Sequence, residues 1–274
     1  MSRVLVTGSA GFVGQRVMKQ LALKDHQPVG FDLADNQDVM DLGAVRTVAA
    51  GCSAVIHLAA ADVPADNQRI TLTNVDGSQN VIRAAVEAGT RRVVLISSAE
   101  SLGIFMGEAP PDYFPIDNSH PVRPRTPYGR SKLAMERSGQ QAAAEFGLEV
   151  VCLRPPGVCD DATREWIRSE RAKRPSFEWD PIWEYGAWIH VEDLARACVA
   201  ACFCPAPVGR FASVLVAATD NNSDVYGSRE LAQKLHPEVP WQGGDEYQTS
   251  PRLTLYRSDA AETLLRWKPS KMWK

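Results

Sequence analysis

The sequence predicts an α/β fold in which helices cover both faces of a parallel β-sheet. Short, almost continuously apolar runs recur in the first part of the chain, and amphipathic stretches separate them. Such runs are buried on both faces, which is typical of parallel strands joined by helical crossovers. The apolar runs cover residues 3–8, 28–33, 54–60, 92–98 and 148–155, and the helical stretches lie around 12–24, 67–88 and 127–147.

A glycine-rich turn follows the first predicted strand. The segment "TGSAGFVG" (7–14) places glycines between that strand and the first helix, where they allow a tight turn and close backbone approach to a pyrophosphate. The N–H groups and the dipole of the helix N-terminus attract the phosphates. We therefore predict a Rossmann-type, doubly wound dinucleotide-binding core over residues 1–155. Its predicted cofactor contacts in the turn are Gly8, Ala10, Gly11, Phe12, Val13 and Gly14.

An acidic residue, Asp32, indicates which dinucleotide binds. It ends the second strand about twenty residues after the turn, where a carboxylate accepts hydrogen bonds from the adenosine ribose. Leu33 and Ala34 follow it, and no arginine or lysine is adjacent to balance the 2′-phosphate of NADP. The pattern favours NAD over NADP.

The remaining chain, residues 156–274, differs in composition. All 7 tryptophans fall after the fifth predicted strand, so the two parts are expected to have different roles. The apolar segment 209–218 indicates a strand that returns to the sheet, and the residues around it would cover the carboxyl edge of the sheet. We predict a small C-terminal substrate lobe, with a returning strand and helix that complete the sheet.

Composition argues against several classes of function. The net charge is −3 and the pI about 6.0, which provides no broad attraction to nucleic acid or anionic membrane. No apolar run reaches the roughly 18 residues of a membrane-spanning helix, and a strand expected from Arg3 leaves no room for a signal peptide. The 6 cysteines are scattered, without C-x-x-C or a cluster of partner ligands. We expect a cytoplasmic protein that acts on a small molecule and holds no metal.

A series of motifs, in order along roughly the first 200 residues, resembles the extended short-chain dehydrogenase/reductase family, which includes the NAD-dependent epimerases and dehydratases. The set is specific, whereas each motif alone is not. Besides the glycine turn, the motifs are "HLAA" (57–60), "NVDGSQNVIRAA" (74–85), "SSAESLG" (97–103), "YGRSK" (128–132) and "IHVEDLARA" (189–197).

The resemblance implies a catalytic set of Ser98, Tyr128 and Lys132. Oxidation of an alcohol needs a base for the hydroxyl proton, and a free tyrosine, with a pKa of about 10, is a poor base at neutral pH. The four-residue spacing places Tyr128 and Lys132 on one helix face, so the ammonium group can stabilise the phenolate and also hold the nicotinamide ribose. Ser98 would donate a hydrogen bond to the substrate oxygen.

The resemblance also implies contacts along the cofactor and an assembly. Asn74 would support the cofactor, as Tyr128 and Lys132 do. The helices around 67–88 and 127–147 would pair with those of a second subunit in a homodimer. The other implied contacts are Asp41 and Leu42 near the adenine, Leu58, Ala59 and Ala60 along the dinucleotide, and Pro155 and Val158 beside the nicotinamide amide.

Departures from the family pattern indicate which branch the chain resembles. Members that act on nucleotide sugars have asparagine and arginine where this chain has Gly157 and Gly186, and dehydratases have aspartate where it has Ala99. The compact chain instead resembles the uronate dehydrogenase branch. A substrate carboxylate calls for a guanidinium group, for which Arg164 is the candidate. Ser98 and Glu100 complete the expected substrate contacts.

The leading hypothesis is an NAD-dependent oxidoreductase that takes a hydride from a hydroxyl carbon of a sugar, sugar acid or related polyol. The first alternative is an NAD-dependent nucleotide-sugar epimerase, or less plausibly a dehydratase, of the same family. A further alternative is an NAD-binding sensor without catalysis, against which the complete set of Ser98, Tyr128 and Lys132 argues.

Overall fold

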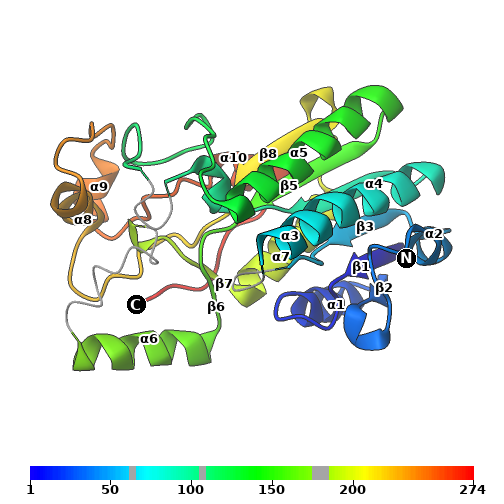
Figure 1. Ribbon diagram of the computed structural model, residues 1–274. Helices are drawn as coiled ribbons and strands as arrows, with labels where there is room; N and C mark the ends of the chain where they lie inside the picture. The colour runs from blue at the N-terminus through cyan, green and yellow to red at the C-terminus, as the bar shows by residue number, and fades with distance from the viewer. Residues whose placement is uncertain (62–65, 105–108, 175–184) are drawn as a thin grey trace.

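The core of the protein is a parallel sheet, as the sequence predicts. The computed structural model describes residues 1–61, 66–104, 109–174 and 185–274. The 6 strands lie in the order β2-β1-β3-β4-β5-β8, and every neighbouring pair is parallel (Figure 1). The strands are β1 (Arg3–Thr7), β2 (Gln27–Phe31), β3 (Ala54–His57), β4 (Arg92–Ile96), β5 (Glu149–Arg154) and β8 (Phe211–Leu215). The strand order reverses between β1 and β3, and ligands bind at such a switch point, outside the carboxyl ends of the strands.

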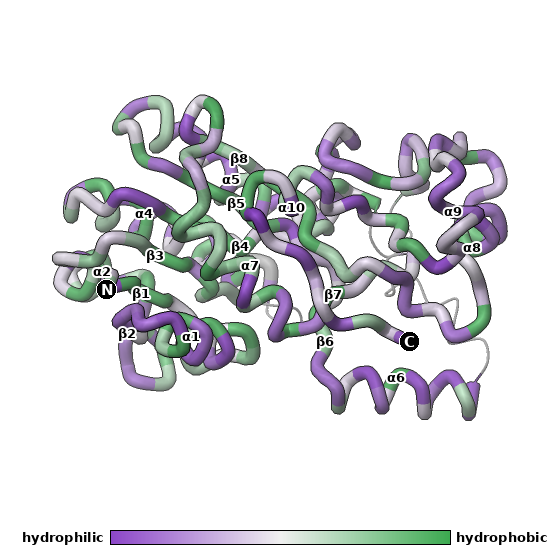
Figure 2. Tube along the Cα trace, turned by 180° about the vertical axis from the view of Figure 1, so that it is seen from behind, coloured by the Kyte–Doolittle hydropathy of each residue, from purple (hydrophilic) through white to green (hydrophobic). Residues whose placement is uncertain are grey.

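Two layers of helices cover the sheet because its strands are apolar on both sides. Along β1, Val4 and Val6 belong to one hydrophobic cluster, whereas Leu5 belongs to the other. The strands are mostly coloured as hydrophobic in Figure 2. The first cluster contains side chains of α1 (Gly14–Leu23), α7 (Val191–Phe203) and α10 (Asp259–Leu265), and the second those of α2 (Leu42–Ala49), α4 (Ser78–Glu87) and α5 (Pro127–Phe146).

The stretch predicted as one helix over residues 67–88 consists of three segments. A short helix α3 (Asn67–Thr71) leads into a π-helical segment, Leu72–Gly77, which continues as α4. π-helical turns are rare and are frequent at functional sites. This one carries Asn74, and the distinction from an α-helix is invisible in an apolar repeat of 3.6 residues.

The second part of the chain contributes to both the sheet and a lobe beside it. The segment predicted as a returning strand forms β8 next to β5, and α7 and α10 pack on the sheet. Figure 1 shows the lobe beyond the carboxyl ends of the strands. The lobe contains α6 (Asp161–Lys173), α8 (Ser228–Leu235), α9 (Glu246–Thr249) and a small sheet of β6 (Val158–Cys159) and β7 (Ile189–His190).

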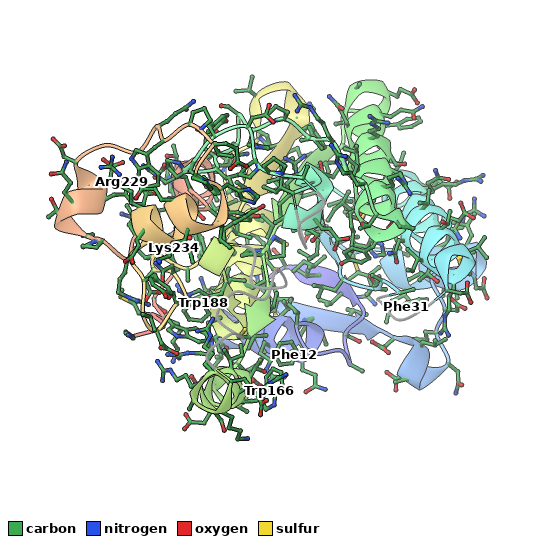
Figure 3. All side chains as sticks on the ribbon, turned by 60° about the vertical axis from the view of Figure 1, so that its left-hand side comes forward. Phe12, Phe31, Trp166, Trp188, Arg229 and Lys234 are labelled. Atoms are coloured by element: carbon green, nitrogen blue, oxygen red, sulfur yellow. The ribbon has the colours of Figure 1, made fainter. Side chains whose placement is uncertain are left out.

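Aromatic side chains occupy different environments in the lobe. Trp188 is buried and packs edge-on against the buried Trp273, with ring centroids 5.2 Å apart. Trp166 lies on α6 with 53% of its surface exposed, and Figure 3 shows both Trp166 and Trp188. In the described part of the chain, 3₁₀ turns lie at Leu33–Asp35, Ala99–Leu102 and Val208–Arg210, among others.

All cysteines are buried and free. In the described ranges, no cluster of three or more His, Cys, Asp or Glu side chains could hold a metal ion. Within the same ranges, none of the helices combines the length and apolar character that crossing a membrane requires.

Candidate active site

Two adjoining cavities open at the carboxyl ends of the strands. The first has a volume of about 440 Å³ and lies beside β2 and the glycine turn, whereas the second, of about 480 Å³, reaches from that turn to α5. Both are lined by Gly8, Gly11, Leu58 and Ala60, so together they form one elongated site. This is the location that the strand order favours for a dinucleotide.

The glycine turn is shaped by close backbone contacts. Gly8 has a φ of +71°, and a Cβ atom there would lie 2.7 Å from the backbone nitrogen of Ala59. A Cβ atom on Gly14 would lie only 2.0 Å from the carbonyl oxygen of Gly8. Among the described residues, no acceptor binds the N–H groups of Phe12 and Val13. These donors lie at the N-terminus of α1, where they fit a pyrophosphate.

Asp32 is held at the end of β2 by backbone donors. Its Oδ2 accepts from the Ala10 N–H at 2.8 Å, and its Oδ1 accepts from the Ala34 N–H at 2.9 Å. Asp32 lines the first cavity together with Arg69. The two residues are far apart in the sequence, so inspection of the residues next to Asp32 could not identify Arg69 as a neighbour. The carboxylate therefore lies between the glycine turn and the wall of the cavity, where it fits the adenosine ribose of NAD.

The residues expected near the adenine, Asp41 and Leu42, lie at the start of α2, and their contact with the adenine stays a prediction. Asp41 caps α2 by accepting from the Ala44 N–H at 3.0 Å, and Leu42 packs against the hydrophobic cluster under that helix. Asp38 and Val39 line the first cavity instead. The segment Leu58–Ala60 lies along the cavities as expected, with Ala59 on the first and Leu58 and Ala60 on both.

Helix α5 begins immediately before its functional residues. Thr126 is the N-cap, and its hydroxyl accepts from the Gly129 N–H at 2.9 Å. Pro127 occupies the first helical position, where a missing N–H costs no helical hydrogen bond. The cap thereby sets the angular position of every side chain in the first turns, including Tyr128.

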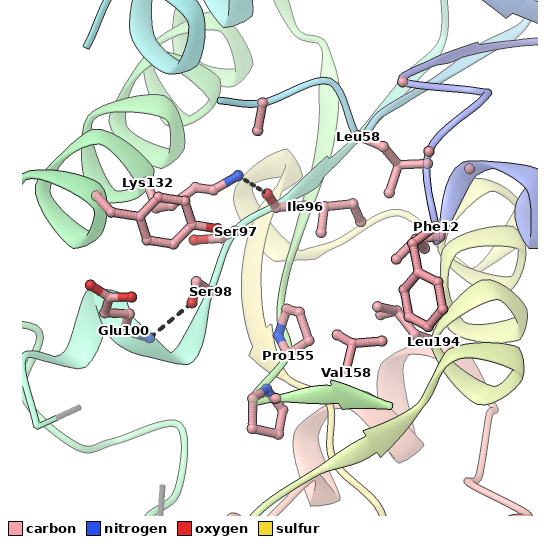
Figure 4. A pocket seen from close by; sticks show the side chains of 18 residues that line it. Phe12, Leu58, Ile96, Ser97, Ser98, Glu100, Lys132, Pro155, Val158 and Leu194 are labelled. Carbon is pink, nitrogen blue, oxygen red and sulfur yellow. Dashed lines mark hydrogen bonds between the residues drawn. The ribbon is translucent and has the colours of Figure 1, made fainter. Parts of the chain in front are cut away.

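Tyr128 and Lys132 lie together at the second cavity. The Nζ of Lys132 is 5.4 Å from the centre of the Tyr128 ring and donates to the carbonyl oxygen of Ile96 at 2.9 Å (Figure 4). Lys132 is only 4% exposed. Because little water screens this ammonium group, its charge acts strongly on groups near it.

Ser98 and Glu100 approach the same cavity from the end of β4. The Oγ of Ser98 accepts from the Glu100 N–H at 3.1 Å, and the carboxylate of Glu100 accepts from the Thr126 hydroxyl. Ser98, Tyr128 and Lys132 all line this cavity, so the structure brings the predicted catalytic set together. Its opposite wall includes Pro155 and Val158 (Figure 4).

Asn74 supports the site from behind. Its Oδ1 accepts from the Ala61 N–H at 2.7 Å, and its Nδ2 donates to the Ala61 carbonyl at 3.0 Å and to the Ser131 hydroxyl at 3.1 Å. Ser131 donates in turn to the carbonyl of Tyr128 at 2.7 Å. Asn74 therefore connects the segment after β3 to the first turn of α5. It is absent from the described lining of both cavities.

His57 is a buried residue that sequence analysis did not single out beyond its motif. Its Nδ1 lies 2.7 Å from the Thr7 hydroxyl and its Nε2 lies 2.8 Å from the Ser78 hydroxyl. Ser78 donates to the Asn74 carbonyl, so His57 carries its proton on Nε2 and accepts from Thr7. Burial, and to a lesser extent the charge of Lys132, lowers the pKa of His57 to about 3. The imidazole is neutral and links the glycine turn to α4.

A buried ion pair lies one turn beyond Lys132 on α5. Glu136 accepts from Arg154 of β5 at 2.8 and 2.6 Å, and from the Ser97 hydroxyl at 2.5 Å. Both charged side chains are at most 7% exposed. Tyr128, Lys132 and Glu136 follow one another at four-residue steps, and this spacing in the sequence indicates that Glu136 shares their helix face.

Arg164 contacts the last residues of the chain. Its guanidinium group donates to Asp161 at 3.0 Å and to the carbonyls of Met272 and Trp273 at 2.7 and 2.9 Å. It also stacks near the ring of Trp188. It is outside the described lining of both cavities. Arg164 holds the last part of the chain against α6, and its contact with a substrate carboxylate stays a prediction.

The fold and the site are those of an NAD-dependent enzyme of the extended short-chain dehydrogenase/reductase type, a group that contains both oxidoreductases and epimerases. The model of the NAD dependent epimerase/dehydratase family matches residues 4–206, and the chain belongs to this family. The glycine turn, Asp32 and the catalytic set all lie within the matched range.

Relatives with different activities cover most of the chain. A UDP-glucose 4-epimerase from Halalkalibacterium halodurans is 26% identical, over 97% of this chain and 90% of its own length. A uronate dehydrogenase from Pseudomonas syringae pv. tomato is 24% identical, over 89% of this chain and 92% of its own length. The fold is similar to that of a short-chain dehydrogenase/reductase superfamily protein from Agrobacterium tumefaciens, solved with bound NAD, with a TM-score of 0.72, 23% identity and coverage of 99% and 93% of the two chains.

Proposed function

We propose that the protein is an NAD-dependent dehydrogenase that oxidises a hydroxyl-bearing carbon of a sugar, sugar acid or related polyol. The observation that carries this proposal is the convergence of Ser98, Tyr128 and Lys132 on one cavity that adjoins the glycine turn. The likeness to a uronate dehydrogenase supports a reaction that releases its oxidised product. In the described part of the chain, neither Gly157 nor Gly186 offers a side chain for a nucleotide diphosphate.

The chain's own residues would manage the proton and the substrate oxygen. NAD, when bound, supplies the hydride acceptor. Tyr128, as the phenolate, accepts the proton of the substrate hydroxyl, and the ammonium group of Lys132 stabilises that phenolate by its charge. The hydroxyl of Ser98 donates a hydrogen bond to the substrate oxygen while it becomes a carbonyl. Asn74 holds the first turn of α5, and so the direction of Tyr128, through Ser131.

The proposal is tested by following NADH formation with a panel of aldoses, polyols and uronates. Wild-type protein should reduce NAD with at least one of them, and Tyr128→Phe should lower kcat by a factor of at least about 10³ because the base is lost. NAD binding by the Tyr128→Phe variant, measured by calorimetry, should persist and serve as the control for folding. Tyr128→Phe with unchanged turnover would reject the assigned base.

The UDP-glucose 4-epimerase relative, which aligns with 97% of the chain, favours one alternative. An epimerase would retain NAD tightly, convert UDP-glucose to its epimer and accumulate no NADH. Turnover of UDP-glucose without any signal from free sugars would therefore replace the dehydrogenase by the epimerase. A dehydratase would instead release water from a nucleotide sugar, and a sensor would bind NAD without turnover of either substrate class.

We also propose a homodimer and a cytoplasmic location. A groove of about 520 Å³ runs between α4 and α5, and Phe146 at its border is 63% exposed, which supports pairing of these helices with a second copy. The free, buried cysteines support a reducing compartment. Sedimentation analysis of wild type and Phe146→Asp tests the assembly, since only wild type should dimerise. The groove is lined by Gln79, Ile82, Arg83, Val86, Glu87, Ser138, Gln141, Ala142, Glu145 and Phe146.

A further inference from the structure

We infer that the catalytic cavity selects an uncharged, hydroxyl-rich substrate and discriminates against carboxylates and phosphates. The inference rests on the proposed dehydrogenase function and narrows its substrate class. It departs from what the names of the two relatives suggest, because uronates and UDP-sugars are anions. The inference is argued from the charged side chains and the hydrogen-bond donors of the cavity wall.

The cavity has little positive charge for an anionic substrate. Lys132 is the only lysine or arginine among the described residues that line it, and its ammonium group already binds the Ile96 carbonyl beside Tyr128. The segments 62–65, 105–108 and 175–184, which lie outside the described residues, contain no lysine, arginine or histidine in the sequence. They cannot add a cation to the site.

Glu100 makes the cavity less suitable for an anion. It lines the wall next to Ser98 and is 8% exposed. As a carboxylate it repels a second negative charge, and burial strengthens that repulsion because water screens it poorly. As a neutral acid it supplies no positive charge either. In both forms its oxygens can accept hydrogen bonds from the hydroxyl groups of a polyol.

The backbone of the opposite wall offers few donors. Pro155 and Pro156 line the cavity in succession, and proline has no N–H group. On the other side, the N–H of Glu100 is already taken by the Ser98 hydroxyl. Anion sites in proteins combine several convergent N–H groups or a guanidinium fork. Among the described residues that line this wall there is no guanidinium group, and Arg154, the nearest arginine in sequence, is paired with Glu136.

The two glycines that replace polar family residues differ in the space around them. A Cβ atom on Gly157, which lines the cavity, would meet nothing within 4 Å. Gly186 instead has a φ of +78°, and a Cβ atom there would lie 3.0 Å from Leu231 and 3.2 Å from Asn221. A cation can therefore be introduced at position 157 without disturbing the backbone, but not at position 186.

The test compares matched sugars that differ in one carboxylate: galactose with galacturonate, and glucose with glucuronate. Wild-type protein should oxidise the neutral member with a kcat/KM at least about tenfold higher, and its NADH complex should bind the neutral member more tightly by calorimetry. Gly157→Arg should shift both ratios toward the acid by about tenfold or more. Gly157→Ala adds a methyl group without charge and should keep the wild-type preference. Glu100→Gln should narrow the preference.

The outcomes separate the two proposals. Oxidation or binding of the uronate at least as strong as that of the neutral sugar would overturn the charge inference and leave the dehydrogenase intact. Absence of NADH from every sugar, with tighter binding of the neutral member, would reject the dehydrogenase and support the charge inference. Failure of both members to bind, or a Gly157→Arg variant with the wild-type preference, counts against the inference as well.

Discussion

Lys132→Met is the perturbation that most directly tests the electrostatic basis of the site. In the wild type, the ammonium group lies 5.4 Å from the centre of the Tyr128 ring and is 4% exposed. Coulomb's law with an effective dielectric constant of about 20 gives roughly 3 kcal/mol of attraction to a phenolate at this distance. Because each 1.36 kcal/mol corresponds to about a factor of ten, loss of the charge should lower kcat/KM near pH 7 roughly 100-fold.

The pH profile separates this effect from damage to the fold. Without the ammonium charge, the phenolate forms only at higher pH, so the ascending limb of kcat/KM should move to higher pH and part of the activity should return there. Urea unfolding measures the separate cost of losing the hydrogen bond to the Ile96 carbonyl. A variant whose activity falls by the same factor at every pH, with an unmoved limb, would refute the electrostatic role of Lys132.

Other residues of the site lead to further expectations. Asp32→Ala should raise the KM for NAD by about tenfold or more and narrow the preference for NAD over NADP, because it removes the carboxylate at the ribose position. Initial rates with both cofactors measure this preference, and an unchanged ratio of kcat/KM for NAD to that for NADP would contradict the role of Asp32. Since His57 has a folded pKa of about 3 against 6.5 for the free side chain, the unfolded chain binds the extra proton, and stability should fall by about 2 kcal/mol between pH 7 and pH 5. His57→Gln should flatten that part of the urea-derived stability profile, and an equal slope in both proteins would argue against the assignment. Glu136→Ala should lower the free energy of unfolding by about 3 to 5 kcal/mol because it leaves Arg154 buried without its partner, whereas the exposed Glu165→Ala should change stability little.

The sheet and the main site residues were predictable because they depend on local patterns. The inner strands β1, β3, β4 and β5 are short apolar runs, and their burial on both faces follows from that composition, whereas the edge strands β2 and β8 are only partly buried. The glycine turn can be recognised in the sequence because it needs residues that permit a positive φ or close backbone contact, as Gly8 and Gly14 do. Tyr128 and Lys132 were assignable because four residues correspond to about one helical turn.

Contacts between segments that are distant in the chain could not be predicted from local sequence patterns. Asn74 lies in a π-helical turn and joins Ala61 to Ser131, and no periodicity distinguishes that turn from an α-helix. Arg164 was a reasonable ligand for a carboxylate from its place in the chain, yet it binds carbonyls more than 100 residues away. A candidate donor can be recognised from its residue type, but its acceptor is known only after folding.

Local sequence patterns were enough to predict the parallel sheet, the glycine turn and the grouping of Ser98, Tyr128 and Lys132, because apolar repeats, glycines and helical spacing act within a few residues. Three properties could be read only from the folded structure: which nitrogen of His57 carries the proton, the pairing of Glu136 with Arg154, and which charged side chains line the cavity. Each of these depends on groups that are distant in the chain and meet in an interior from which water is excluded. There, the energy of a charge or a proton is set by its neighbours rather than by its own residue type.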